Sequence, residues 1–290
     1  MHIFESPDSG NIYFGNIIID YEKGAIFVIF TACSKNCPDN KWSNYVSKSL
    51  DDGQTWSKPV NISSQIGAFQ YRGGPSLGVQ KKQPPHIGRL IACGHTEPLS
   101  VDGVFCLFSD DSGDSWILGE SVLGIPFGQK KVDGDYLPDE ATTVELPNGD
   151  LMVNARNQYH FHCRCRLTMV SKDGGETFPT EFVRVNEDLP DSACSAGLAM
   201  FDDKTMLFTN PNNENERVDM TLRWSTDLGH SWKNSFLIFP GISAYSSVTT
   251  MQNTNSNNYT TNIIVAYERQ IGPVSTIALA VIDPHGNLDI

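Results

Sequence analysis

The sequence SLDDGQTW, residues 49–56, decides the fold, because the same pattern returns three more times along the chain. The pattern is Ser-x-Asp-x-Gly-x-(Thr/Ser)-(Trp/Phe), and the other copies are SDDSGDSW at 109–116, SKDGGETF at 171–178 and STDLGHSW at 225–232. Their first residues lie 60, 62 and 54 positions apart. Self-similarity at a nearly constant period indicates a repeat architecture built from one supersecondary unit.

Each octamer is predicted to be a turn that joins two strands. The Asp side chain accepts hydrogen bonds from the backbone N–H groups that follow it, and the Gly supplies a positive φ. The closing aromatic side chain buries a large apolar surface and holds the hairpin in place. We therefore predict a structural role for the octamers and assign no catalytic role to them.

The same order of strands is predicted around each octamer. In the third unit a first strand at residues 141–146 is followed by a Pro-Asn-Gly turn, a second strand at 150–156 and a third at 165–170 that leads into the octamer. Matching second strands are predicted at 24–30, 88–93, 204–209 and 262–267, and matching third strands at 103–108 and 217–224. Units of four short strands predict an all-β fold, a β-propeller with about five blades.

The two ends of the chain depart from the repeat. In the fifth unit the octamer is lost, and DPHGN at residues 283–287 occupies the corresponding turn. Residues 1–5 are expected to form an orphan fourth strand whose three partners precede Met1. The prediction is therefore a single propeller domain over residues 1–290 that lacks its first blade.

Composition narrows the classes of function. The chain has 290 residues and a net charge of −13 at pH 7, so it offers little to neutralise phosphates, and nucleic acid is not a predicted partner. It contains no run of 18 apolar residues and no recognisable signal peptide. Its seven cysteines form no dense disulfide framework, and their odd number leaves one thiol free.

Four polar side chains are predicted to meet on the face opposite the octamers. In an up-and-down unit, the start of strand one, the end of strand two and the start of strand three share one face. Glu140 and Tyr245 are predicted at the starts of first strands, Arg156 at the end of a second strand and Arg217 at the start of a third. They come from units three, four and five, so only the stacking of units brings them together.

The types of these residues suit chemistry on an acidic sugar. Two arginines from different blades hold a carboxylate by bidentate hydrogen bonds. A Tyr beside a Glu forms an unusual nucleophile, because the carboxylate accepts the phenolic proton as the oxygen attacks. Taken singly, each residue is as readily structural, with Glu140 and Arg156 as a salt bridge and Tyr245 as a half-buried strand residue.

The stretch HFHCRC, residues 160–165, invites interpretation as a metal site. Strand alternation would send its histidines and cysteines to opposite faces. Its spacing also matches no standard zinc pattern. We predict neither a metal nor a cofactor.

The sequence resembles the animal sialidases (neuraminidases), most closely the lysosomal type, over nearly the whole chain. The segments that carry the resemblance are residues 88–95, 102–111, 124–129, 138–140, 154–158, 217–225 and 244–247. The resemblance implies a six-bladed sialidase-type propeller that removes terminal α-linked sialic acid from glycoproteins, oligosaccharides or gangliosides, with retention. By motif match, Tyr245 would be the nucleophile and Glu140 its base partner, while Arg156 and Arg217 would be two of three arginines that hold the substrate carboxylate.

The resemblance carries further expectations. The Arg-Ile-Pro motif that supplies the first arginine, and the acid/base Asp, are expected upstream of Met1; Arg72 does not match that motif and is not assigned to the site. A lysosomal setting is implied, with a protective partner protein or a homo-oligomer. Two alternatives stay open at this point, a catalytically inactive sialoglycan-binding propeller and a propeller that serves only protein contacts.

Overall fold

The computed structural model describes residues 10–33, 42–67, 71–74, 76–96, 103–121, 137–255, 258–283, 286 and 288–289. Within these ranges the chain forms β-strands and one 3₁₀ helix, η2 (Thr180–Phe182), which confirms the all-β prediction. The strand predicted at residues 1–5 and the segment 124–129 lie outside the described residues. No helix in the described part of the chain is long and apolar enough to cross a membrane.

Four hydrogen-bonded sheets follow one another along the chain. The first contains β1 (Asn11–Asp20), β2 (Ala25–Cys33), β3 (Ser43–Ser49) and β4 (Val60–Asn61). The second contains β5 (Tyr71–Gly73), β6 (Val79–Gln80), β7 (Leu90–Thr96), β8 (Val104–Ser109) and β9 (Ile117–Leu118). The third contains β10 (Pro138–Glu145), β11 (Leu151–Asn157), β12 (Cys165–Ser171) and β13 (Arg184–Pro190). The fourth contains β14 (Gly197–Met200), β15 (Met206–Pro211), β16 (Val218–Ser225), β17 (Asn234–Asn255), β18 (Asn258–Ile271), β19 (Val274–Ile282) and β20 (Leu288–Asp289).

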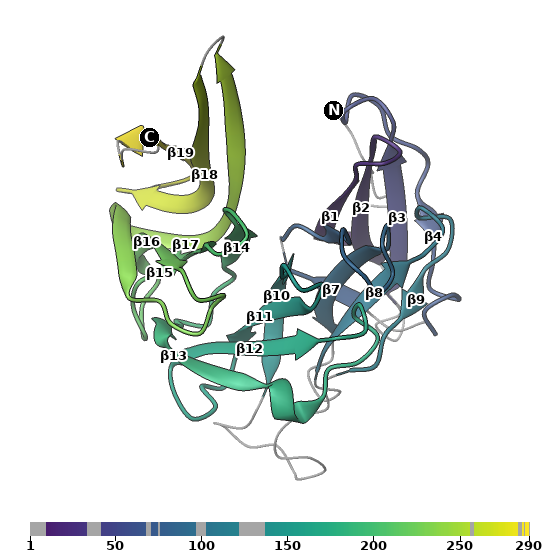
Figure 1. Cartoon of the computed structure of the whole chain (residues 1–290), viewed down its shortest axis with the longest axis horizontal. Helices are drawn as coiled ribbons and strands as arrows, with labels where there is room; N and C mark the ends of the chain where they lie inside the picture. Colours follow the sequence, from purple (N-terminus) through teal and green to yellow (C-terminus); the bar gives the residue numbers. More distant parts are fainter. Residues whose placement is uncertain are drawn as a thin grey trace.

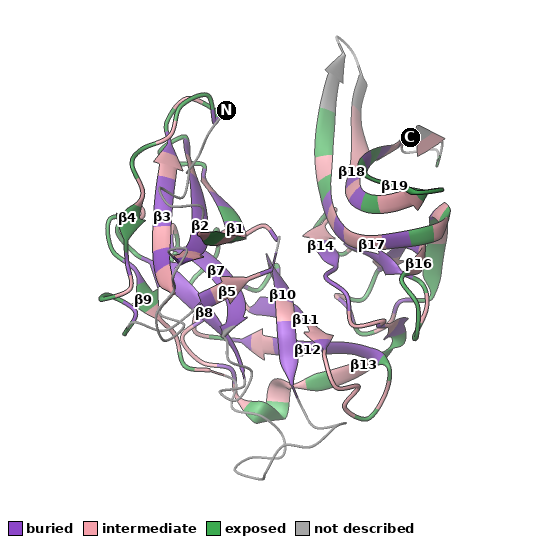
Figure 2. Ribbon diagram, turned by 180° about the vertical axis from the view of Figure 1, so that it is seen from behind, coloured by how far each residue is buried: buried purple, intermediate pink, exposed green. Residues whose placement is uncertain are grey.

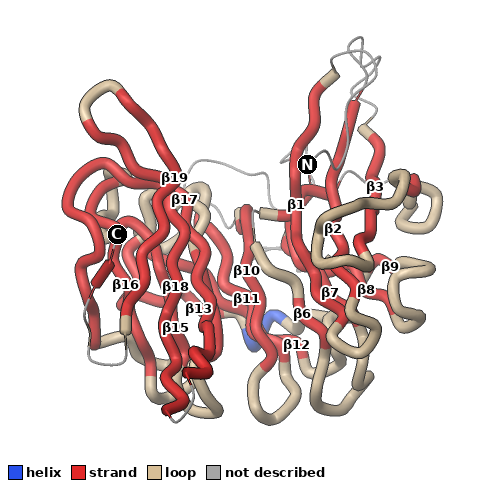
Figure 3. The backbone as a smooth tube through the Cα atoms, turned by 90° about the horizontal axis from the view of Figure 1, so that it is seen from above, coloured by secondary structure: helices blue, strands red, loops and turns tan. Residues whose placement is uncertain are grey.

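The seven-stranded sheet contains two units of the repeat that share strand β17. Residues 234–242 of β17 pair with β16, and residues 243–255 pair with β18. The fourth strand of unit four therefore runs without a break into the first strand of unit five, where the sequence predicted two separate strands. The units follow one another around an open arc, from β1 at the N-terminal end to β18–β20 at the C-terminal end (Figure 1). Seen from above, the strands run between two rims that carry the connecting loops (Figure 3).

The octamers are turns between the third and fourth strands, as predicted. In the first copy, Asp51 Oδ1 accepts a hydrogen bond from the Thr55 N–H at 2.8 Å, and Ser49 Oγ accepts one from the Gly53 N–H at 2.9 Å. Gly53 has a φ of +80°, in the left-handed region that favours glycine. The bonds to the Asp and Ser side chains recur at Asp111, Asp173 and Asp227 and at Ser109, Ser171 and Ser225.

The octamer carboxylates make these turns sensitive to acid. Hydrogen bonds from Ser225 and Ser231 lower the pKa of Asp227 from 3.8 to about 2. Because the pKa is lower in the folded chain, this stabilisation is complete above about pH 4 and is lost as the pH falls towards 2. We expect Asp227→Asn to lower the urea midpoint of unfolding more at pH 6 than at pH 2.5, with the exposed Asp203→Asn variant as control. Equal losses at the two pH values would contradict this role.

The hydrophobic core lies between successive units. Strands β8 and β15, which lie in the middle of their units, are buried along their whole length. The fourth strands β4 and β13 carry mostly exposed or half-buried residues (Figure 2). At three junctions an octamer aromatic joins the buried cluster, with Trp116 between units one and two, Phe178 between two and three and Trp232 between three and four. The octamers therefore fasten each unit to the one before it.

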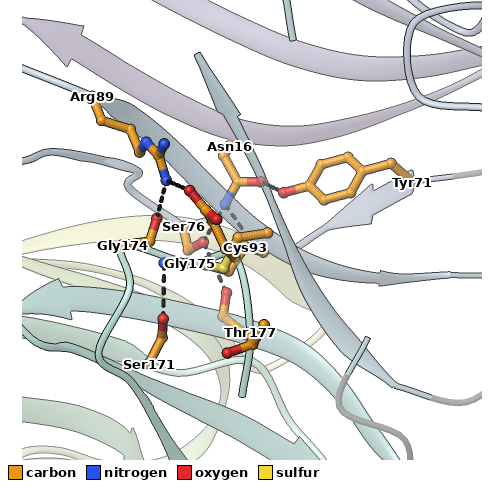
Figure 4. The surroundings of a disulfide bond; sticks show 12 residues. Asn16, Tyr71, Ser76, Arg89, Cys93, Ser171, Gly174, Gly175 and Thr177 are labelled. Carbon is orange, nitrogen blue, oxygen red and sulfur yellow. Dashed lines mark hydrogen bonds and ion pairs between the residues drawn. A yellow bond between two sulfur atoms is a disulfide. The ribbon is translucent and has the colours of Figure 1, made fainter. Parts of the chain in front are cut away.

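The third octamer shows this contact in detail (Figure 4). Arg89 of the second unit donates from Nη1 to the Gly174 carbonyl at 3.2 Å. Gly175 of the turn packs against Cys106, which forms a disulfide with Cys93 across β7 and β8. Cys163 and Cys165 form another disulfide, and Cys194 is free and buried.

Candidate active site

Glu140 lies at an irregular position near the start of β10, and Tyr245 lies at an equivalent position near the start of the part of β17 that pairs with β18. The pairing of β10 with β11 shifts register between Pro138 and Ala141, and the pairing of β17 with β18 shifts between Ser243 and Ser246. A bulge of this kind bends the strand and redirects a side chain. The third and fifth units therefore each present one functional group from an equivalent bulge, a feature that the alternating pattern of the sequence did not predict.

The Glu140 carboxylate receives a hydrogen bond on each oxygen. The Tyr245 hydroxyl donates to Oε1, and Arg156 Nη1 donates to Oε2 at 2.9 Å. The side chains of Glu140 and Arg156 are both 14% exposed, so the ion pair is largely shielded but still reachable from solvent. A carboxylate, a phenol and a guanidinium from the first and second strands of unit three and the first strand of unit five thus form one cluster.

The Tyr245 phenol is held in its protonated form. Burial raises its pKa and the Glu140 carboxylate raises it further, against the opposing effect of Arg156 and Arg217. A phenol of this kind becomes a nucleophile only if a base takes its proton during attack. Glu140 is in position to be that base, because it already accepts the hydroxyl hydrogen bond.

A second carboxylate, Asp139, lies behind the cluster and was not singled out from the sequence. Its Oδ1 lies 3.0 Å from His95 Nε2, and its Oδ2 lies 4.0 Å from Arg156 Nε. Burial raises the pKa of Asp139, but the hydrogen bond and charge of His95 and the charge of Arg156 outweigh it and hold the pKa below its usual value. For Arg156, burial lowers the pKa, and Asp139 and Glu140 together raise it above the usual value.

Arg217 reaches the cluster from unit four, immediately before β16. Its Nη2 donates to the Ala193 carbonyl at 2.7 Å, and its guanidinium carbon lies 5.5 Å from the centre of the Tyr245 ring. Three of the four predicted site residues are therefore joined by hydrogen bonds, and Arg217 approaches through the tyrosine ring. Arg72 was not assigned to the site, and its guanidinium carbon lies 4.1 Å from the centre of the Tyr13 ring.

The buried ion pair between Asp191 and Arg166 supports the positions of Arg156 and Arg217. No pattern in the sequence indicated this pair. Asp191 Oδ2 accepts from Arg166 Nη1 at 3.2 Å and from the backbone N–H of Asn157 at 2.8 Å, next to Arg156. Its Oδ1 accepts from the Cys194 N–H at 3.1 Å, which holds the turn that presents the Ala193 carbonyl. The side chains of Asp191 and Arg166 are both 0% exposed.

The argument against a metal site assumed that residues 160–165 alternate as a strand, and for residues 160–164 this assumption is wrong. These residues form a loop, in which His160 and His162 have φ values of +57° and +60°. The Asn157 side chain closes the loop by donating to the carbonyls of Phe161, Cys163 and Cys165. Among the residues that the structure describes, no three side chains are grouped to bind a metal ion.

The repeat agrees with comparisons to known proteins. The model of the BNR repeat-like domain family matches residues 11–257. A sialidase of Micromonospora viridifaciens is 31% identical over 225 residues, which cover 71% of this chain and 31% of that protein. The chain belongs to the BNR-repeat sialidase family. A sialidase of Vibrio cholerae serotype O1 is 30% identical over 235 residues, covering 73% of this chain and 30% of that protein.

Solved sialidase structures share the propeller fold. The Hadza microbial sialidase Hz136 superposes with a TM-score of 0.68 at 24% identity, over 89% of this chain and 50% of that one. The leech intramolecular trans-sialidase superposes with a TM-score of 0.69 at 14% identity, over 93% of this chain and 56% of that one. At these identities the likeness concerns the fold alone.

The family assignment confirms part of the resemblance found in the sequence. Membership of the BNR-repeat sialidase family is established. The two relatives named above are bacterial, so the resemblance to the animal, lysosomal type stays a prediction. The chain spans about a third of the length of these two curated sialidases.

Proposed function

We propose that this BNR-repeat sialidase chain forms the sugar-binding and nucleophilic face of an exo-α-sialidase that acts on sialylated glycans with retention. The observation that carries the proposal is the hydrogen bond from the Tyr245 hydroxyl to Glu140, because a tyrosine paired with a carboxylate is the nucleophile of sialidases. Arg156 and Arg217 are assigned to the carboxylate of the sugar.

The chemistry follows from this arrangement. Tyr245 Oη bonds to the anomeric carbon while Glu140 takes the phenolic proton, and the bond from that carbon to the leaving oxygen breaks. Water then attacks the anomeric carbon as the bond to Tyr245 Oη breaks. Glu140 returns its proton to Tyr245 Oη, and the water gives a proton to the conjugate base of the acid that protonated the leaving oxygen. The two inversions give net retention. The proton for the leaving oxygen must come from an acid other than Glu140, because Glu140 is receiving the phenolic proton in the same step.

The neutral phenol explains why tyrosine suits an anionic substrate. A bare carboxylate nucleophile would meet the negative charge of the sugar at short range, whereas the protonated Tyr245 carries none. The net charge of −13 also repels anionic sugars at long range, so local guanidiniums must supply the attraction. We also propose that the enzyme is of the lysosomal type and acts on glycoproteins, oligosaccharides or gangliosides. Because lysosomes are acidic, activity should be assayed at acidic pH.

Hydrolysis of a fluorogenic sialoside between pH 4 and 6 tests the proposed function. Release of the fluorophore supports it. Saturable binding of the sialoside without turnover would replace it by a sialoglycan-binding role. Absence of both turnover and binding would favour the alternative that the propeller serves only protein contacts.

Arg217→Ala tests the assignment of the arginines. Loss of a charge-assisted hydrogen bond to the substrate carboxylate removes about 1.5–3 kcal/mol, so we expect KM or Kd for the sialoside to rise about 10- to 100-fold. The matched control is Arg184→Ala, because Arg184 is exposed on β13 and bonds to the Glu181 carbonyl. An unchanged Kd in the Arg217 variant would remove this residue from the binding site.

A further inference from the structure

The fifth unit leaves open a space that an octamer fills at the other junctions. Its sequence at residues 283–287, DPHGN, has no Ser-x-Asp-x-Gly pattern and no closing aromatic residue. The buried cluster between units four and five accordingly contains residues of β15–β19 but no octamer ring. The three junctions before it each contain one.

The filled junctions show how an octamer enters this space. The octamer glycine rests on the preceding unit, since a Cβ at Gly113 would lie 2.3 Å from the Phe27 ring and one at Gly229 would lie 3.2 Å from the Met152 sulfur. The following aromatic ring then inserts between the sheets. The centre of the Trp116 ring lies 6.2 Å from that of Phe27, in an edge-on arrangement.

A cavity of about 370 Å³ lies between units four and five, at the octamer end of the strands. Leu207, Leu222 and Ile282 line it and are at most 4% exposed. The half-buried rings of Trp224 and Phe236 also line it. Asp283 and Gly286, which belong to the turn that replaces the octamer, stand at its edge. The cavity therefore occupies the position of the missing octamer.

We propose that this cavity binds a small, uncharged aromatic molecule of about the size of indole. Its volume falls in the usual range of ligand sites, about 300–1,000 Å³, and apolar cavities lined by Leu, Ile and Phe bind simple aromatic rings. Trp224 and Phe236 offer ring faces and edges to such a ligand. The residues that line the cavity include no basic side chain, so an anionic ligand would lose its water there without gaining a cationic partner.

The site is separate from the candidate active site. It lies at the octamer end of units four and five. Glu140 and Arg156 lie near the opposite ends of β10 and β11, and Tyr245 lies near residue 243, where β17 passes from unit four to unit five. The proposal therefore does not depend on sialidase activity, and it is tested by binding alone.

Titration of the whole chain with indole by calorimetry tests the proposal. We expect saturable binding at one site and a rise in Tm of about 3 °C at ten times the Kd. Indole-3-carboxylate is expected to bind at least tenfold more weakly, because its carboxylate would lose water in a site lined mainly by apolar side chains. Absence of saturable indole binding, or equal affinity for the two compounds, would overturn the proposal.

Two variants that fill the cavity locate the binding site. Thr261→Trp and Thr205→Trp place a ring into the cavity from unit five and unit four, and each is expected to weaken indole binding at least tenfold. Thr249→Trp places the same side chain at an exposed position of β17 and is the matched control, with unchanged affinity expected. If one filling variant fails to fold, the other still decides. Full affinity in a folded filling variant, or a crystal structure with indole bound elsewhere, would overturn the assignment.

Discussion

Tyr245→Phe is expected to reduce turnover of a fluorogenic sialoside by about 10³-fold or more, while the chain folds as before. The substitution removes the atom that is assigned to attack the anomeric carbon, and losing a nucleophile that acts with its base abolishes most of the catalysis by both. The ring stays in place against Arg217, because that contact does not involve the hydroxyl. The measurements are kcat and KM at acidic pH, and the urea midpoint.

Glu140→Gln and the double variant sharpen this test. If Glu140 acts only as the base for Tyr245, the double variant should be no slower than the slower of the two single variants. Tyr21→Phe is the control, because Tyr21 is 68% exposed on a turn between β1 and β2. Retention of a tenth or more of the activity by Tyr245→Phe would exclude the tyrosine as nucleophile.

Asp191→Ala is expected to lower the free energy of unfolding by about 3–5 kcal/mol. The substitution leaves the fully buried guanidinium of Arg166 without its carboxylate, and an uncompensated buried charge is costly. It also removes the acceptor of the Asn157 and Cys194 backbone N–H groups. Urea unfolding at pH 7 measures the loss, and the exposed Asp203→Ala variant should stay within about 0.5 kcal/mol of the wild type.

A double variant separates the charge from the packing. If the cost arises from the unpaired guanidinium, Arg166→Met combined with Asp191→Leu should be more stable than Asp191→Ala, because apolar replacements of similar volume remove the buried charge. A double variant that is less stable than the single one would show that the hydrogen bonds from Arg166 to Asn154 and to the Cys194 carbonyl outweigh the cost of its unpaired charge.

Substitution of Asp191 should also change the positions of Arg156 and Arg217 in the candidate site. Ala193, whose carbonyl holds Arg217, lies in the turn that Asp191 closes through the Cys194 N–H, and Asn157 follows Arg156 directly. We therefore expect Asp191→Ala to weaken sialoside binding under conditions in which the variant is still folded.

Features that depend on local chemistry were predictable. The octamer turns, their hydrogen bonds and the positive φ of their glycines follow from neighbouring residues, so the sequence predicted them correctly. The predicted strands that lie within the described residues were also placed within a few residues. The run of β17 through two units was missed, because Pro240-Gly241 is a turn signal in the sequence, whereas the structure continues one strand through it.

The candidate site was only partly visible. Glu140, Arg156, Arg217 and Tyr245 were chosen for their places at strand ends, and the structure joins three of them by hydrogen bonds. Their catalytic roles stay a prediction. Asp139, His95, Asp191 and Arg166 were not singled out, because a buried charge becomes meaningful only when its partner from another strand is known.

The sequence by itself determined the repeating unit, because each octamer is a turn whose hydrogen bonds close within eight residues. Only the tertiary structure decided which side chains meet across units, since the contact between Glu140 and Tyr245 spans 105 residues and depends on how the intervening sheets stack. The same stacking leaves the cavity beside the fifth unit. A missing aromatic residue is visible in the sequence, but the space it leaves exists only when two sheets face each other.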